Sequence, residues 1–136
     1  MKTILVFGVF DGLHAGHLDF LQAAAAMGDR LIVSLAQDEI VMQLKGRAPE
    51  HSFKRRAAVL KELSAVAEVI PGDAELGAYV GYRALNPDLV AFGYDQRALA
   101  QDFKRFQQAV GDETPTFVLK PYQPETYKSS LLRGQK

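Results

Sequence analysis

Residues 3–17 read TILVFGVFDGLHAGH, and this stretch decides the fold of the chain. Its first five residues are mostly apolar and rich in β-branched side chains, a pattern typical of a buried strand. Gly8, Gly12 and Gly16 then interrupt the run, and from His17 onward the composition is helical. We therefore expect a strand, a glycine-rich loop and a helix in direct succession, which is the opening unit of a parallel α/β sheet.

The rest of the chain alternates in the same way. Further strands are expected at residues 30–36, 66–70, 88–93 and 116–119, and helices at residues 17–27, 38–44, 53–63, 76–85, 98–110 and 128–133. Gly28 is placed to end the first helix and Ser52 to cap the third. Strands that alternate with helices indicate a parallel sheet with helices on both faces, joined by right-handed crossovers. The sequence thus predicts a single Rossmann-like α/β domain over residues 1–136, with a five-stranded parallel sheet.

The composition excludes several classes of function. Sixteen basic and sixteen acidic residues give a formal net charge of zero, so the whole molecule lacks the field that favours nucleic acid or an anionic membrane. The chain has no cysteine, which excludes disulfides, thiolate zinc sites and a cysteine nucleophile. No apolar run approaches the roughly 20 residues of a membrane span, and the N-terminus lacks a signal-peptide pattern. We therefore expect a cytoplasmic protein.

The charged residues are unevenly distributed along the chain. Six Lys or Arg residues lie from Lys45 to Lys61, against the single acidic residue Glu50. Such a cationic band on a neutral protein favours a small polyanionic ligand over a long polymer. A solvated helix face is the alternative interpretation.

The loop after the first strand is suited to binding phosphate. Ligands of open parallel sheets collect where the strands end, and Gly8 and Gly12 let backbone amides approach a ligand closely. The start of the following helix adds unpaired N–H groups and a partial positive charge. His14 and His17 are three residues apart, so both imidazoles can point at one site and donate hydrogen bonds to phosphate oxygens. Two alternatives stay open here: a capped loop with incidental histidines, and a metal site of two imidazoles with Asp11.

A resemblance to a known family rests on two motifs in this loop, Gly8-Val9-Phe10-Asp11 and His14-Ala15-Gly16-His17. They are similar to the GxFD element and the HxGH motif of the cytidylyltransferase-like nucleotidyltransferases. The resemblance covers nearly the whole chain. It implies an enzyme that transfers a nucleoside monophosphate from an NTP, either ATP or CTP, to a small phosphorylated acceptor and releases pyrophosphate. It also implies that His14 and His17 contact the NTP phosphates in catalysis, with the nucleotide against Gly8, Val9, Phe10, Asp11 and Gly16.

Two cations of the band match further family positions. Lys45 matches a phosphate-binding lysine in a mobile loop, and Arg47 is a second candidate. Arg56 matches a helix arginine that lies near the phosphates. Its neighbour Arg55 points about 100° away on a helix, so only one of the two is expected to reach the site, and we choose Arg56.

The remaining family positions follow the fourth strand and lie near the C-terminus. Gly93 and Asp95 stand where relatives carry a glycine and an acidic residue near the base and ribose. Asp95 could also help to hold Mg²⁺ through water, but no site made of protein side chains alone is expected, because the divalent cation arrives with the NTP. Lys128, Ser129 and Ser130 resemble the last family motif and would hold the β- and γ-phosphates.

The acceptor is the least determined part of the prediction. The segment Ser64-Ala65-Val66-Ala67-Glu68-Val69 departs from the Arg-Tyr-Val-Asp-Glu-Val of glycerol-phosphate cytidylyltransferases, which serves substrate binding and dimer contacts. The Lys45-Gly46 loop and residues 93–96 look closer to archaeal-type FAD synthases, so FMN adenylylation is favoured. Glycerol-3-phosphate or sugar-phosphate cytidylyl or adenylyl transfer fits the same motifs. A homodimer is possible, as in many relatives. A non-catalytic nucleotide sensor and a flavodoxin-like interaction module are alternatives of other classes.

The expected nucleotidyl transfer needs no general base from the protein. The phosphate of the acceptor is already ionised at pH 7, so its oxygen can attack the α-phosphorus in line without a general base. Catalysis then depends on alignment and on donors placed around the developing negative charge.

Overall fold

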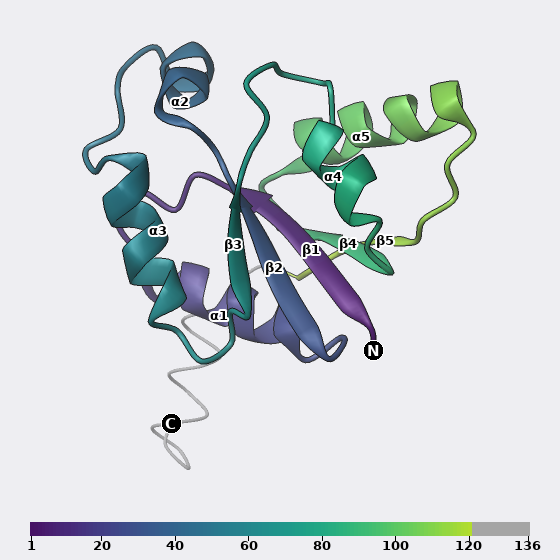
Figure 1. Cartoon of the computed structure of the whole chain (residues 1–136), viewed down its shortest axis with the longest axis horizontal. Helices are drawn as coiled ribbons and strands as arrows, with labels where there is room; N and C mark the ends of the chain where they lie inside the picture. Colours follow the sequence, from purple (N-terminus) through teal and green to yellow (C-terminus); the bar gives the residue numbers. More distant parts are fainter. Residues whose placement is uncertain (121–136) are drawn as a thin grey trace.

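The computed structural model describes residues 1–120, in which helices cover both faces of one sheet (Figure 1). The strands are β1 (Thr3–Gly8), β2 (Arg30–Leu35), β3 (Glu68–Pro71), β4 (Leu89–Phe92) and β5 (Thr116–Val118). All neighbouring strands are parallel, and their order is β3-β2-β1-β4-β5. The predicted α/β class and the five-stranded parallel sheet are therefore confirmed.

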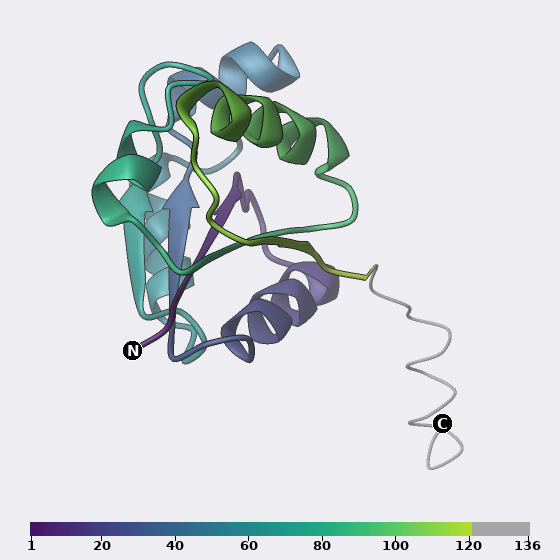
Figure 2. The same ribbon diagram turned by 90° about the vertical axis from the view of Figure 1, so that its right-hand side faces the viewer.

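The helices divide between the two faces of the sheet and its carboxyl edge. They are α1 (Ala15–Ala25), α2 (Asp38–Lys45), α3 (Phe53–Lys61), α4 (Val80–Leu85) and α5 (Arg97–Val110). Helices α1 and α3 lie on one face and α4 and α5 on the other (Figure 1, Figure 2). Helix α2 lies beyond the arrowheads of the central strands (Figure 1).

Two apolar layers fill the space between the sheet and the helices. Ile4 and Val6 of β1 pack in the cluster that includes Leu21 of α1, whereas Leu5 packs in the opposite cluster with Phe103 of α5. Successive strand residues point to opposite faces, so a strand with both faces covered is apolar at every position. This explains why residues 3–7 form a continuous apolar run rather than an alternating one.

The predicted start of one helix is wrong by about one turn. The sequence predicts a helix at residues 76–85, but α4 begins only at Val80. Gly77 and Tyr79 have φ values of 81° and 52°, outside the helical region. The carboxylate of Asp73 accepts two N–H groups at the start of α4, at 2.9 and 3.0 Å, and so replaces the missing turn. The other predicted boundaries within the described residues agree to one or two positions, and the predicted helix at 128–133 lies outside them.

The carboxyl edge of the sheet is where the long connections begin. Because all five strands run in one direction, the segments that follow β1, β2 and β4 leave from the same edge. These segments carry the histidine loop, Lys45 and Asp95. Within residues 1–120, every helix is too short or too polar to cross a membrane.

Candidate active site

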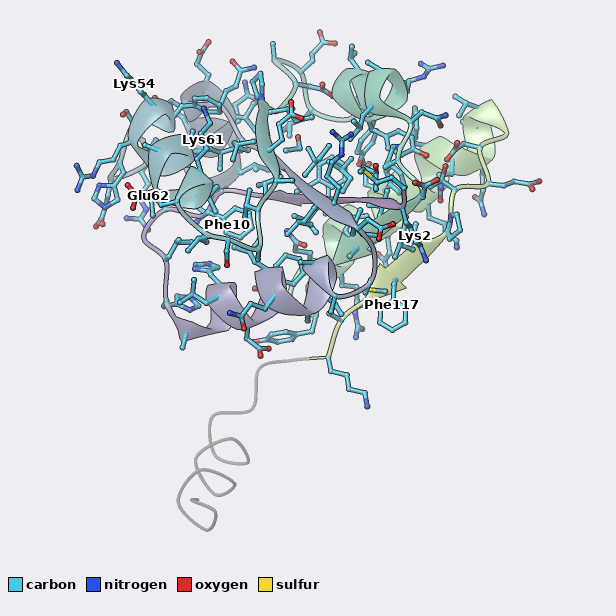
Figure 3. The ribbon with its side chains drawn as sticks, turned by 60° about the horizontal axis from the view of Figure 1, so that its bottom comes forward. Lys2, Phe10, Lys54, Lys61, Glu62 and Phe117 are labelled. Atoms are coloured by element: carbon cyan, nitrogen blue, oxygen red, sulfur yellow. The ribbon has the colours of Figure 1, made fainter. Side chains whose placement is uncertain are left out.

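The loop after β1 is shaped by close packing around Phe10. This side chain is 7% exposed and lies between α1 and α3 (Figure 3). A Cβ atom on Gly8 would overlap the Phe10 ring, so the loop requires glycine at that position. Phe10 itself has a φ of 48°, which is costly for a bulky residue and is retained only where the surroundings fix it.

The two histidines of the loop cap α1 and contact each other. His14 Nδ1 accepts the N–H groups of Gly16 at 3.0 Å and of His17 at 3.4 Å, while His17 Nδ1 accepts the N–H of His14 at 3.3 Å. The rings are stacked with their centroids 3.8 Å apart and an interplanar angle of 22°. The structure therefore brings both imidazoles to one place, as their spacing predicts.

This capping assigns the tautomer of both rings. A neutral imidazole has one acceptor and one donor nitrogen, and here Nδ1 of each ring accepts a backbone N–H. The proton of each ring is therefore on Nε2, which is left to donate to a ligand. His14 thus accepts two of the N–H groups at the helix start, those of Gly16 and His17, and the contact of Gly16 with the nucleotide stays a prediction.

Charges from two other loops act on His17. Burial lowers the pKa of His17, and the neighbouring His14 lowers it further. Asp95 raises this pKa and Lys45 lowers it by smaller amounts, so both charges are close enough to act on the imidazole. The tertiary structure thus brings three segments together at the carboxyl edge, from the β1 loop, the end of α2 and the end of β4. The lowered pKa favours the uncharged form of His17.

The side chain of Gln96 connects the turn after β4 to the end of β1 through two hydrogen bonds. A Cβ atom on Gly93 would lie 2.9 Å from the carboxylate of Asp95, so glycine allows the tight turn. Gln96 accepts the N–H of Gly93 at 2.9 Å and donates to the carbonyl of Phe7 at 2.8 Å. Sequence reasoning missed the role of Gln96, and its position directly after Asp95 is the only signal that the sequence offers.

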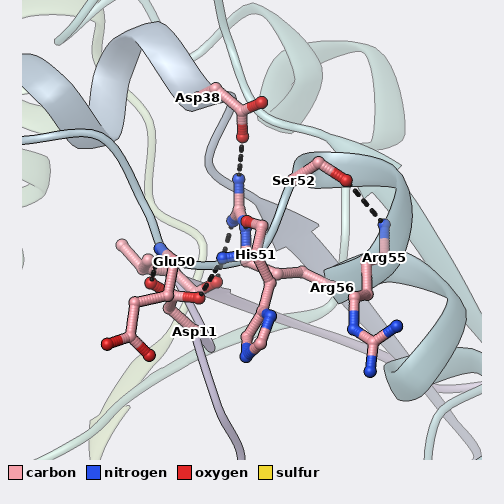
Figure 4. A network of polar contacts seen from close by, with 8 residues as sticks. Asp11, Asp38, Glu50, His51, Ser52, Arg55 and Arg56 are labelled. Carbon is pink, nitrogen blue, oxygen red and sulfur yellow. Dashed lines mark hydrogen bonds and ion pairs between the residues drawn. The ribbon is translucent and has the colours of Figure 1, made fainter.

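Asp11 and Arg56 belong to one network of polar contacts (Figure 4), and the nucleotide contact expected for Asp11 stays a prediction. The Asp11 carboxylate accepts the N–H groups of Glu50 at 2.7 Å and His51 at 3.0 Å. Burial alone would raise the pKa of Asp11, but these two N–H groups outweigh it and hold the pKa below its usual value.

Arg56 is the buried centre of the same network. Its side chain is almost fully buried, and its guanidinium donates to the carbonyls of His51 and Val9, each at 2.9 Å, and to Asp38 at 2.6 Å. The phosphate contact expected for Arg56 stays a prediction. In this structure its three terminal nitrogens are all engaged within the fold.

A pocket of about 100 Å³ opens beside this network. It is lined by Phe10, Gly12, Leu13, His51, Arg55, Arg56 and Val59. Arg55 is the exposed arginine of this pocket, whereas Arg56, the arginine chosen from the sequence, is buried.

Of the remaining predicted site residues, Lys45 and Arg47 lie outside this network and pocket. Lys45 is exposed at the end of α2, followed by Gly46 with a φ of 74°. Arg47 lies in the loop after it and is also exposed. Lys128, Ser129 and Ser130 lie outside the described residues. Over residues 1–120 no group of three His, Asp or Glu side chains could hold a metal ion.

Comparisons with known proteins agree with this geometry. The sequence model of the Cytidylyltransferase-like family matches residues 5–135. The FAD synthase of Thermococcus sibiricus is 42% identical over 106 residues, which are 75% of this chain and 72% of that protein. The FAD synthase of Pyrococcus abyssi is 38% identical over 133 residues, which are 98% of this chain and 87% of that protein.

A solved structure has the same fold over nearly the same length. The lipopolysaccharide core biosynthesis protein from Thermoplasma volcanium superposes with a TM-score of 0.81 and 27% sequence identity. The match covers 90% of this chain and 99% of that one.

Proposed function

This chain belongs to the cytidylyltransferase-like family and is a nucleotidyltransferase, and from this premise we propose that it is an FAD synthase. It transfers AMP from ATP to the phosphate of FMN and releases pyrophosphate. The similarity to the Pyrococcus abyssi FAD synthase over 98% of the chain carries this proposal, because it extends well beyond the motif loop.

The histidine pair supports the phosphoryl-transfer part of the proposal. Nε2 of His14 and Nε2 of His17 are both donors, and both rings stand at the start of α1. Two donors held in fixed positions stabilise charge that develops on the α-phosphate without a cost of reorganisation. Lys45, whose charge acts on His17, would supply a positive charge for the β- and γ-phosphates.

The divalent cation is expected to travel with the nucleotide. When bound, Mg²⁺ neutralises charge on the phosphates and leaving pyrophosphate. In this proposal its ligands are phosphate oxygens and water, and Asp95 would contact the cation through a water molecule. The cytoplasmic location and a homodimer stay predictions.

An acceptor screen tests the function. The protein is incubated with Mg²⁺ and either ATP or CTP, together with FMN, glycerol 3-phosphate or a sugar phosphate, and pyrophosphate and FAD are measured. We expect pyrophosphate and FAD from ATP with FMN. Sugar phosphates belong in the screen because the Thermoplasma volcanium protein is described as a lipopolysaccharide core biosynthesis protein. Turnover with another acceptor but not with FMN would contradict the proposal, and tight NTP binding without any pyrophosphate would favour a sensor.

A further inference from the structure

We propose that the pocket between the β1–α1 loop and α3 binds the phosphate of the acceptor substrate, and that Arg55 and His51 are its ligands. This inference rests on the proposed function, in which the acceptor is a phosphate monoester. It assigns to Arg55 and His51 a role that the sequence motifs did not indicate.

The size and walls of the pocket fit one end of a substrate. At about 100 Å³ it is far smaller than the roughly 300–1,000 Å³ of pockets that enclose a whole drug-sized ligand. Phe10, Leu13 and Val59 form its apolar walls, and the polar side chains of His51 and Arg55 complete it. A phosphoryl group with the adjoining CH₂ matches this combination, whereas a flavin ring system does not fit inside.

The two proposed ligands are available to a substrate. The side chains of His51 and Arg55 project to the same side from the start of α3 (Figure 4). Among the hydrogen bonds and ion pairs of residues 1–120, none uses the Arg55 guanidinium or the His51 imidazole. A guanidinium presents paired N–H donors with the geometry of phosphate oxygens, and an imidazole adds a further donor.

The position of His51 is fixed from two directions. Its N–H donates to Asp11 at 3.0 Å, and its carbonyl accepts from Arg56 Nε at 2.9 Å. Arg56 also holds the carbonyl of Val9, so the β1–α1 loop and the start of α3 form one unit. The backbone that carries His51 is therefore fixed before a substrate binds, which limits the freedom lost on binding.

The pocket adjoins the histidine pair. Phe10 lines the pocket and meets the ring of His17 edge-on, with the centroids 5.4 Å apart. Gly12 and Leu13 also line it, and His14 follows them directly in the chain. A phosphate in the pocket therefore lies next to the α-phosphate that the imidazoles hold.

This placement serves the transfer step. One oxygen of the acceptor phosphate forms a bond to the α-phosphorus of the NTP. The bond from that phosphorus to the oxygen bridging to the β-phosphate breaks, and pyrophosphate leaves with the electron pair. The pocket holds the other acceptor oxygens and so aligns the nucleophile, which needs no deprotonation.

Steady-state kinetics of matched variants test the proposal. Arg55→Gln is compared with Lys54→Gln, which removes the same charge from the adjacent residue, whose side chain points outward (Figure 3). We expect Arg55→Gln to raise KM for FMN by about tenfold or more, as for loss of a charge-assisted hydrogen bond, and to leave KM for ATP within about twofold. Lys54→Gln should change neither the KM for FMN nor the KM for ATP by more than about twofold. Thermal unfolding of both variants checks that the fold is unchanged.

Two outcomes of the kinetics would overturn the proposal. A raised KM for ATP with an unchanged KM for FMN would assign the pocket to the NTP phosphates. An Arg55→Gln variant indistinguishable from Lys54→Gln would remove the pocket from the site.

A binding experiment separates this proposal from the proposed function. The chain has three histidines, so the imidazole signals in proton NMR can be assigned with His51→Gln. Glycerol 3-phosphate and FMN should shift the His51 signals in the wild type and much less in Arg55→Gln, whereas glycerol should not shift them. If the wild type forms no FAD but this shift occurs, the FAD synthase assignment fails and the phosphate pocket stands. If FAD forms and no phosphate monoester shifts His51, the pocket proposal fails alone.

Discussion

His14 and His17 cap the same helix for each other: Nδ1 of each ring accepts the backbone N–H of the other residue, at 3.4 and 3.3 Å. The arrangement is a capping box in which both side chains are imidazoles. Each ring therefore has one nitrogen that caps the helix, and in the proposed mechanism the other nitrogen donates to the nucleotide. This division of roles allows catalysis and stability to be separated by substitution.

Substitutions at His17 should separate the contribution of Nδ1 to stability from the contribution of Nε2 to catalysis. His17→Ala should lower kcat by about a hundredfold or more, because one preorganised donor is lost. His17→Asn places an amide oxygen near the position of Nδ1 and has no equivalent of Nε2. It should therefore keep the thermal stability of the wild type and have the low kcat of His17→Ala. A near-normal kcat for either variant, with only a raised KM, would contradict the role assigned to His17 Nε2.

The lowered pKa of His17 predicts a pH dependence of stability. Burial and His14 lower the pKa of His17 in the folded protein below its ordinary value of 6.5. The unfolded chain then binds the proton first as the pH falls, so the contribution of His17 to stability is complete above about pH 6.5 and is lost as the pH falls toward the folded pKa. Scanning calorimetry between pH 8 and pH 5 should show a falling Tm in the wild type and a weaker fall in His17→Asn. If Tm fell equally with pH in the wild type and in His17→Asn, the titrating group would not be His17.

Arg56 should contribute mainly to stability. Replacing it with Gln leaves the partly buried carbonyls of Val9 and His51 without their donor and removes the ion pair with the half-exposed carboxylate of Asp38. We expect a loss of roughly 2–4 kcal/mol in the free energy of unfolding, measured by urea denaturation. Arg55→Gln, one position earlier and exposed, should change it by less than about 0.5 kcal/mol. A stable Arg56→Gln variant that had lost only ATP affinity would support the phosphate contact expected from the sequence.

Lys45 should contribute to NTP binding without supporting the fold. Lys45→Ala removes an exposed cation whose charge acts on His17. We expect the Kd for ATP in titration calorimetry to rise by about tenfold, the size of one charge-assisted hydrogen bond. Lys61→Ala is the control, because it removes the same charge from the far end of α3. An ATP affinity equal to that of Lys61→Ala would remove Lys45 from the site.

The sequence by itself determined the α/β class, the parallel sheet and the meeting of the two histidines. These features depend on local patterns: apolar runs, glycines at turns, and a three-residue spacing at a helix start. The motif loop and its resemblance also pointed to nucleotidyl transfer before any geometry was known. In such cases the residues that interact are neighbours in the chain, so their spacing is sufficient to predict the contact.

Only the tertiary structure decided which partners Asp11, Arg56 and Tyr79 have within the fold. The partners of Asp11 are 39 and 40 residues away, and Val9 is 47 residues from Arg56. Tyr79 delays the start of α4 because its ring packs against Phe103 of α5 and its hydroxyl donates to Asp102. No spacing in the sequence encodes such contacts, since they exist only after the sheet has brought distant loops to one edge. A charged side chain near a site can bind substrate or hold the loops that form the site, and only the folded chain shows which partners within the protein it has.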